Sequence, residues 1–303
     1  SGATVALAFG QYLATMLSGV SVLTMAVVIV IICSIINYLG MKQSARMNAL
    51  CTTIELLGLL IILAIGLPKI GSVNLLVMPN GWTGVFQAAA LVFFAYMGFE
   101  TIVKLTEETK NPSKNIPKSI IYSLVITTAL YILVSMSAVS ILHWTSLSES
   151  KAPLADVAAT SFGPLAFLVI AIIALFSTSN TILMTVVTTS RLGYGMGKER
   201  ALPRFFARVN PLHGTPTIAI MITGLITAAL VFMKELDAVA NFTNLFLFAT
   251  FAMVNLSVIV LRYRDPSPRP FRIPLNIGRF PLLAAIGAAS CVGMIWFVAM
   301  NLL

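Results

Sequence analysis

The chain has 303 residues, of which 58% are hydrophobic and only 10% are charged, and its mean hydropathy is +0.97. In soluble globular domains about a quarter of the residues are charged, so this composition excludes that class and indicates a polytopic membrane protein. A formal net charge of +9 is also compatible with a surface that binds nucleic acid. The positions of the basic residues argue against that alternative, and we expect a lipid bilayer, and no nucleic acid, around this protein.

Nine apolar segments, separated by short loops, predict an all-α polytopic membrane protein. We expect them to form a single transmembrane domain over residues 1–303. The predicted spans are residues 3–17, 20–39, 47–67, 82–103, 116–142, 164–189, 217–233, 242–261 and 280–302.

The basic residues are concentrated in alternate loops. All but three of the 19 lie after Leu39, Val103, Thr189 and Leu261. The exceptions are Lys69, Lys151 and Lys234. Because lysine and arginine are enriched in cytoplasmic loops, these four loops are predicted to be cytoplasmic and the protein to cross the cell membrane several times.

The chain opens with SGATVALAFG, which contains neither an initiator methionine nor a basic flank. The first predicted span is also shorter than the roughly 20 residues that a bilayer requires. We therefore expect a further segment before this chain in the natural protein.

The fourth span leads into the sequence FFAYMGFETIVKLTEETKNPSKNIPKSI, which places Gly98 and Glu100 inside an apolar segment. A carboxyl group in the bilayer is expensive and marks a functional site by default. One interpretation is a continuous helix in which Glu100 pairs with Lys104, four residues further on. The other is a helix broken at Gly98, whose unwound backbone binds a substrate or an ion.

A second carboxyl group, that of Glu55, lies within the third span. Together with Asn48 and Thr52 it forms a polar stripe that should face other helices rather than lipid. Glu55 is either a structural group hydrogen-bonded in its neutral form or a proton carrier, because burial favours the neutral form and hydration the charged one.

The sixth span contains the polar sequence FSTSNTILMTVVTTSR, with Ser177, Thr178 and Thr181 close together. Most such hydroxyl groups bond to the preceding turn of their own helix. A cluster of them is also suited to coordinating sodium or holding a protonated side chain.

Other patterns in the sequence give no support to an enzyme, a metal site or an organic cofactor. The glycines of RLGYGMGK lack the spacing of a phosphate-binding loop, and we interpret this segment as a cytoplasmic turn. The three cysteines lie inside apolar spans, where they are expected to be small packing residues. No HExxH or nucleophile-elbow sequence occurs.

Three ordered motifs resemble those of the amino acid, polyamine and organocation transporter superfamily. FFAYMGFETIVKLTEETKNPSKNIPKSI resembles its sixth-helix signature, STSNT with SRLGYGMGKERALPRFFARVNP its eighth helix and next segment, and LRYRDPSPRPFRIP its loop between helices ten and eleven. The resemblance covers essentially the whole chain. It implies a LeuT-type five-helix inverted-repeat fold with a discontinuous helix from Phe94 to Glu100. The nine spans would correspond to the end of helix three through helix eleven.

The resemblance also implies a substrate site at this break. Three backbone carbonyls would accept the substrate's amino group, a glycine would permit unwinding, and a phenylalanine would line or gate the pocket. These implied residues are Phe94, Ala95, Met97, Gly98 and Phe99. Glu100 would lie just beyond the break, and the family's helix one, which this chain lacks, would supply the other half of the site.

One position departs from the pattern. Proton-coupled members of the superfamily often have a lysine where TTIELLG places Glu55, and a carboxylate cannot imitate a cation. The coupling ion is thus a proton carried by Glu55, a sodium ion beside it, or absent in an uncoupled exchanger. Glu55, Glu100, Ser177, Thr178 and Thr181 are the candidate coupling or gating residues.

The sequence therefore predicts a secondary active transporter that moves amino acids or related amines by alternating access, coupled to protons. The alternatives are an uncoupled amino acid exchanger, an ion channel and an amino acid sensor that does not transport. The sequence leaves the oligomeric state and the identity of the amino acid open.

Overall fold

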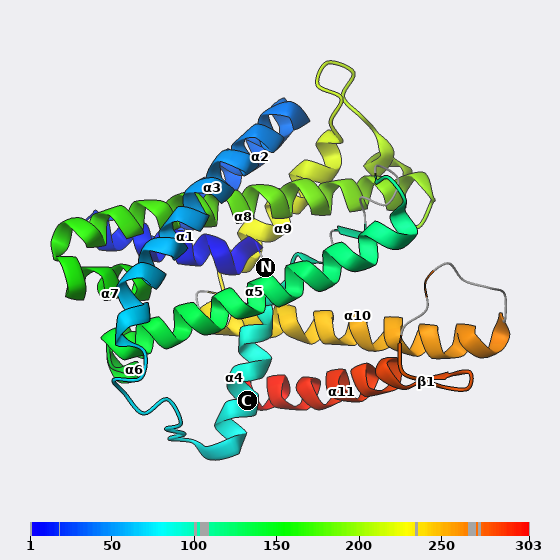
Figure 1. Ribbon diagram of the computed structural model, residues 1–303. Helices are drawn as coiled ribbons and strands as arrows, with labels where there is room; N and C mark the ends of the chain where they lie inside the picture. Colours follow the sequence, from blue (N-terminus) through cyan, green and yellow to red (C-terminus); the bar gives the residue numbers. More distant parts are fainter. Residues whose placement is uncertain are drawn as a thin grey trace. The chain divides into compact units, whose positions relative to one another are not determined.

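The computed structural model describes residues 2–17, 19–99, 102–103, 109–233, 236–265, 271 and 274–302. Helices make up most of it (Figure 1). The α-helices are α1 Gly2–Met16, α2 Val22–Leu39, α3 Met41–Gly66, α4 Gly81–Val92, α5 Pro112–Ile141, α6 Trp144–Glu149, α7 Pro153–Phe162, α8 Pro164–Lys198, α9 Thr217–Val231, α10 Leu236–Arg264 and α11 Leu282–Leu302. The 3-10 helices include η1 Leu67–Lys69, η2 Phe93–Tyr96 and η4 Arg204–Ala207, and the strands Asn276–Ile277 (β1) and Phe280–Pro281 (β2) form a short antiparallel hairpin.

The helices have the length and composition of membrane spans. Six of those in the described residues, α2, α3, α5, α8, α10 and α11, are long and apolar enough to cross a bilayer, whereas α9 and α4 with η2 are apolar but shorter. Each predicted span overlaps a helix. The prediction of an all-α polytopic membrane protein is therefore confirmed.

The sequence-based interpretation of RLGYGMGK as a turn is wrong. Helix α8 continues through this segment to Lys198. An ideal Cβ atom on Gly197 would lie 2.9 Å from the backbone nitrogen of Ala207, and one on Gly193 3.5 Å from Phe206. The missing side chains of these two residues leave room for η4 to pack against the end of α8, so Gly193 and Gly197 serve close packing rather than a change of chain direction.

The loop between the fifth and sixth predicted spans contains two short helices, α6 and α7, that the sequence analysis did not predict. Helix α7 begins with Pro153 at its first turn, and its residues Ala155, Val157 and Ala158 are buried. With only ten residues, α7 gains its stability from packing against α8 rather than from its own length.

The first compact unit comprises residues 1–75 and 130–239 and is organised around α8. In Figure 1, α8 runs through this unit as one long helix, and α1, α2, α3 and α9 all contact it. Its 35 residues correspond to about 50 Å of helix, which exceeds the roughly 30 Å hydrocarbon core of a bilayer. Ile182, Leu183 and Val186 of α8 are buried against Ala3 and Ala6 of α1, whose small side chains let the helices approach closely.

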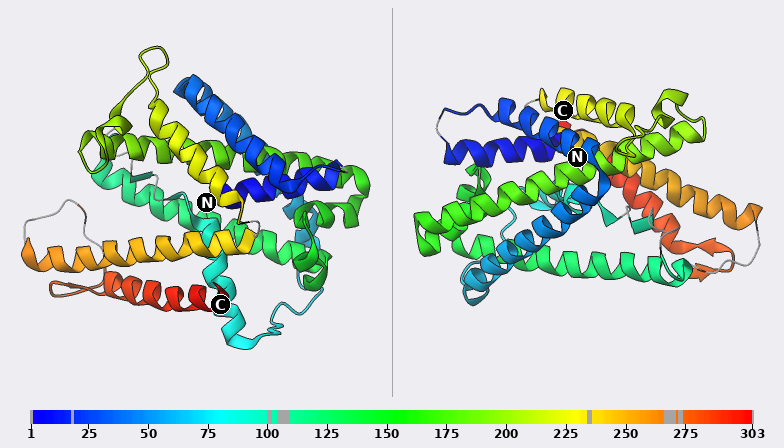
Figure 2. Two further views of the ribbon diagram at one scale, coloured as in Figure 1. Left: turned by 180° about the vertical axis from the view of Figure 1, so that it is seen from behind. Right: turned by 90° about the horizontal axis from the view of Figure 1, so that it is seen from above.

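Helix α3 crosses α8 in the views of Figures 1 and 2. At the crossing, an ideal Cβ on Gly58 would lie 2.6 Å from the Cγ2 atom of Ile173. A second buried cluster forms beside it, with Ile62 of α3, Val157 of α7 and Ile170 of α8. The glycine therefore sets the spacing of α3 and α8 at the place where, as described below, a cavity that contains Glu55 opens between them.

The second compact unit comprises residues 76–129 and 240–303. Its core joins α4, α10 and α11 through Ala90, Phe248 and Val298, all at most 2% exposed. The rings of Phe86 on α4 and Phe297 on α11 stack with centroids 5.3 Å apart. This packing holds the C-terminal end of α4 against two other helices.

Candidate functional site

The α-helical conformation of α4 ends at Val92, well inside the predicted fourth span. Phe93–Tyr96 form a single 3-10 turn, Met97 is extended with φ −60° and ψ 135°, and Gly98 has a φ of +126°. Side chains disfavour this positive φ, whereas glycine adopts it readily. Residue 98 therefore redirects the chain directly after the 3-10 turn.

Steric crowding by neighbouring side chains does not explain why residue 98 is a glycine. No heavy atom of the described residues lies within 4 Å of an ideal Cβ built there. The requirement for glycine arises from the backbone conformation itself.

The predicted substrate-binding residues surround this turn. The carbonyl oxygen of Phe94 accepts a hydrogen bond from the backbone N–H of Met97 at 3.2 Å, which leaves one of its two lone pairs. Ala95 and Gly98 are exposed, and Phe94, Met97 and Phe99 are partly exposed. The predicted residue Glu100, and Lys104 with which it could pair, lie outside the described residues.

Helix α10 supports the end of α4 through an asparagine that the sequence analysis missed. The side-chain amide of Asn244 donates to the carbonyl oxygens of Ala90 at 2.8 Å and Leu91 at 3.1 Å. Asn244 is 0% exposed. The sequence signal that could have identified it is a polar side chain within the apolar eighth span. Such side chains form hydrogen bonds to neighbouring helices in a bilayer.

Aromatic rings cover the same turn. Phe93 packs against Phe248 with ring centroids 4.7 Å apart and against Phe251 at 6.2 Å. Phe99 also contacts Phe251, at 5.8 Å. Phe248 and Phe251 follow Asn244 at four and seven residues, so one face of α10 carries all three contacts.

In the first unit, three of the predicted coupling residues line one cavity. It has a volume of about 230 Å³ and contains Glu55 of α3 together with Ser177 and Thr178 of α8. Tyr12 of α1, which the sequence analysis did not consider, also lines it, and the rest of the lining is largely apolar. A carboxyl group and three hydroxyl groups thus face a small space between helices.

The hydroxyl groups of α8 bond largely to their own helix. Thr178 donates to the carbonyl of Ala174 at 2.7 Å, and Thr181 donates to that of Ser177 at 3.1 Å. Thr181 is exposed and does not line the cavity. The structure therefore brings Ser177 and Thr178 to Glu55 and leaves Thr181 apart.

Two residues of the polar stripe on α3, Thr52 and Glu55, lie beside polar residues of α8. The side-chain amide of Asn180 donates to the hydroxyl oxygen of Thr52 at 3.4 Å, and Asn180 is buried. Among the residues that the structure describes, no group of three or more His, Cys, Asp and Glu side chains could hold a metal ion.

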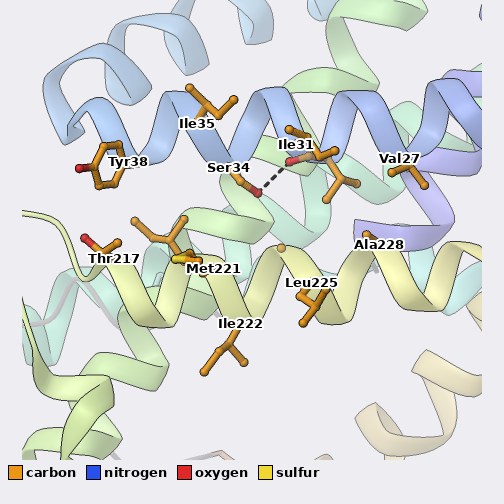
Figure 3. A pocket seen from close by; sticks show the side chains of 13 residues that line it. Val27, Ile31, Ser34, Ile35, Tyr38, Thr217, Met221, Ile222, Leu225 and Ala228 are labelled. Carbon is orange, nitrogen blue, oxygen red and sulfur yellow. Dashed lines mark hydrogen bonds between the residues drawn. The ribbon is translucent and has the colours of Figure 1, made fainter.

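A larger groove of about 830 Å³ runs between α2 and α9 in the first unit (Figure 3). It is lined by apolar side chains from Val27 to Tyr38 on α2 and from Thr217 to Ala228 on α9. The hydroxyl group of Ser34, midway along it, donates to the carbonyl of Val30 at 2.8 Å. With so few polar groups, the groove does not match a charged amino acid.

The model of a protein family described as amino acid permease matches residues 1–302. The chain belongs to this amino acid permease family. It is 31% identical over 272 residues to a branched-chain amino acid permease of Bacillus subtilis, a match that covers 89% of this chain and 58% of that protein. It is also 31% identical over 276 residues to the methylthioribose transporter of the same organism, covering 90% of this chain and 58% of that protein.

Similarity extends to plants. Cationic amino acid transporter 5 of Arabidopsis thaliana is 29% identical over 312 residues, which cover 96% of this chain and 54% of that protein. The chain thus spans little more than half the length of these three relatives. The names of the three relatives give branched-chain amino acids, methylthioribose and cationic amino acids as substrates, so family membership by itself does not define the substrate.

Proposed function

We propose that this amino acid permease is a secondary active transporter of amino acids that works by alternating access. The observation that carries the proposal is the end of α4 at Val92 and the 3-10 and extended backbone that follows up to Gly98. Discontinuous helices at the membrane midplane are the places where transporters of this kind bind substrates. Membership of the family supports the same function.

The substrate's ammonium group would bind to the backbone carbonyls of Phe94, Ala95 and Met97. Carbonyl oxygens are acceptors only, and a bond to an ammonium group is stronger than one between neutral groups. The nearby rings of Phe93, Phe99 and Phe251 are apolar, and we expect them to favour a neutral, apolar amino acid side chain. Phe99 would gate the pocket, and Glu100 would lie just beyond it.

Proton coupling would use the cavity of Glu55. In this proposal the neutral carboxyl group of Glu55 donates a hydrogen bond to the hydroxyl oxygen of Ser177 or Thr178, which line the same cavity. Entry of water would favour release of the proton. Sodium is the alternative coupling ion, because the same oxygen atoms are suitable ligands for it. Thr181 would then contribute to coupling or gating from outside the cavity.

We further propose the LeuT-type five-helix inverted-repeat fold within one transmembrane domain. Two features support it: the discontinuity after α4, and the continuity of α5 and α10, each of which contributes residues to both compact units. In such folds one bundle moves against a scaffold around a fixed substrate site.

The test is uptake of radiolabelled L-leucine and L-arginine into proteoliposomes that contain the full natural protein. We expect leucine uptake to be saturable and to be driven by an inward proton gradient, and to stop when the gradient is collapsed. Large single-channel currents, or specific binding without any uptake, would contradict the proposed transport. Uptake that persists without a gradient, but only with amino acid inside the vesicles, would replace proton coupling with exchange.

A further inference from the structure

We propose that Asn244 is a positioning residue for the substrate site, which it shapes by holding the C-terminal end of α4. The inference rests on the proposed function, since it assumes that the turn after α4 binds the substrate. It assigns a role in that site to a residue of α10 that is distant in sequence.

The geometry fixes the orientation of the Asn244 side chain. The two carbonyl oxygens of Ala90 and Leu91 lie 2.8 and 3.1 Å from the same side-chain nitrogen. An amide rotated by half a turn would instead place its oxygen against both carbonyls, which accept hydrogen bonds and cannot donate them. The amide nitrogen must therefore face α4.

The two carbonyls are among the last four of α4, which runs from Gly81 to Val92. The final four carbonyls of an α-helix have no partner within regular helical bonding and need other donors, above all in a bilayer, where water is scarce. Asn244 donates to two of them, those of Ala90 and Leu91, and the carbonyl of Leu91 also accepts from the backbone N–H of Phe93. Asn244 thereby favours the end of the helix at this position over continued helical winding through Phe94 and Met97.

The side chain of Asn244 is fully buried in the second compact unit. Asn244 is 0% exposed, and its Oδ1 atom is buried without a hydrogen-bond partner among the described residues. Phe248, on the same face of α10, packs on Phe93, the first residue after α4. Burial of an amide with one unsatisfied oxygen is unfavourable, so a residue kept only for packing would be apolar.

The helix offers a matched control at Asn255. This asparagine is also on α10, but its amide nitrogen donates to the carbonyl of Phe251 on its own helix at 2.9 Å. The substitutions N244D and N255D both preserve side-chain shape and remove the N–H donors. A neutral carboxyl group keeps one O–H donor, which cannot bond to both carbonyl groups at once. Only N244D removes bonds to α4.

The experiment measures hydrogen–deuterium exchange of the full natural protein in lipid nanodiscs, together with L-leucine binding and uptake. For N244D we expect backbone amides in peptides covering residues 90–99 to exchange about tenfold faster, the loss expected for one to two hydrogen bonds of ordinary strength. Exchange in α11 and in N255D should match the unmodified protein. The KM for leucine should rise about tenfold with a smaller change in maximal rate, because the site is displaced rather than blocked.

Unchanged exchange over residues 90–99 and an unchanged KM in N244D would overturn the positioning role. If N244D exchanges faster but the unmodified protein transports no amino acid, the contact is supported and the proposed function is contradicted. The failure of the inference and the failure of the proposed function are therefore distinguishable. If N244D does not fold, N244S replaces it: its shorter side chain keeps a single donor and cannot bridge both carbonyls, and the same outcomes apply.

Discussion

At the scale of single residues, Gly98 and Glu55 are the two positions where a substitution tests the candidate sites most directly. Gly98 adopts a positive φ with no atom of the described residues near its missing side chain. Glu55 shares a small cavity with hydroxyl groups from α8. A substitution at Gly98 can change the preferred backbone conformation without filling the site, and a substitution at Glu55 can remove the titratable proton without changing the shape of the side chain.

Replacing Gly98 with alanine tests the backbone conformation without filling the site. The positive φ predicts a destabilisation of about 1–3 kcal/mol and weaker leucine binding, measured by thermal unfolding and by binding in detergent. Gly195 is the control, because it too has open space around its missing Cβ but lies within α8. G195A should be neutral or stabilising by about 0.5–1 kcal/mol. Equal effects of the two substitutions would refute the conformational explanation.

Replacing Glu55 with glutamine tests the proton carrier. Glutamine resembles the neutral carboxyl group but cannot release a proton, so leucine uptake should lose its dependence on the outside pH and on the imposed proton gradient. The measurement is initial uptake rate across a pH series. Glu149 lies in the short helix α6 and is exposed, so E149Q should retain the original profile. An unaltered profile in E55Q would remove Glu55 from the coupling mechanism.

At the scale of the helices, the close approach of α3 and α8 defines the cavity of Glu55. Gly58 lies one turn from Glu55 and has no space for a methyl group, since a Cβ would come within 2.6 Å of Ile173 Cγ2. The Cγ2 atom is attached to a branched carbon and cannot rotate away without moving the rest of the side chain.

The substitution G58A should therefore destabilise the protein by about 1–3 kcal/mol, the usual cost of overpacking. The second substitution I173A removes the clashing atom, and the double variant should be more stable than the sum of the two single effects predicts. G224A serves as the comparison, because its Cβ would meet the hydroxyl oxygen of Ser34 at 2.6 Å. That oxygen can rotate, so G224A should be milder. Simple additivity of G58A and I173A in thermal unfolding would count against this account of the crossing.

At the scale of the whole molecule, alternating charge predicts which loops face the cytoplasm. The segment between α3 and α4 should lie outside, and the segment between α8 and α9 inside. The second of these is tied to the end of α2, where the side-chain amide of Asn210 donates to the hydroxyl oxygen of Tyr38 at 2.9 Å and Thr215 donates to the carbonyl of Tyr38 at 3.0 Å. This contact agrees with the prediction that the loops after Leu39 and Thr189 share one side.

Two strongly exposed leucines provide a test of this topology. Leu76 is 83% exposed in the segment before α4, and Leu212 is 87% exposed in the segment before α9. In intact cells a membrane-impermeant maleimide should label L76C and not L212C, and permeabilisation should expose both. Native Cys33 and Cys51 are buried and Cys291 is partly buried, and replacing them with alanine removes background labelling. Labelling of L212C in intact cells would reverse the predicted orientation.

The sequence by itself determined the class of protein, its long apolar helices and its family. Long apolar segments must become helices in a bilayer because every backbone group needs a partner within the segment. The motif around Gly98 marked the change in backbone conformation, because that change requires a positive φ, which glycine adopts more readily than other residues.

Only the tertiary structure showed which distant side chains meet. It brought Ser177 and Thr178, but not Thr181, to Glu55, and it placed Asn244 against the end of α4. It also showed that Gly193 and Gly197 lie within α8 and serve helix packing rather than a turn. The physical reason is that a helix fixes the direction of each side chain relative to its own axis, whereas the partner in that direction depends on how the helices cross. Local sequence does not encode that crossing.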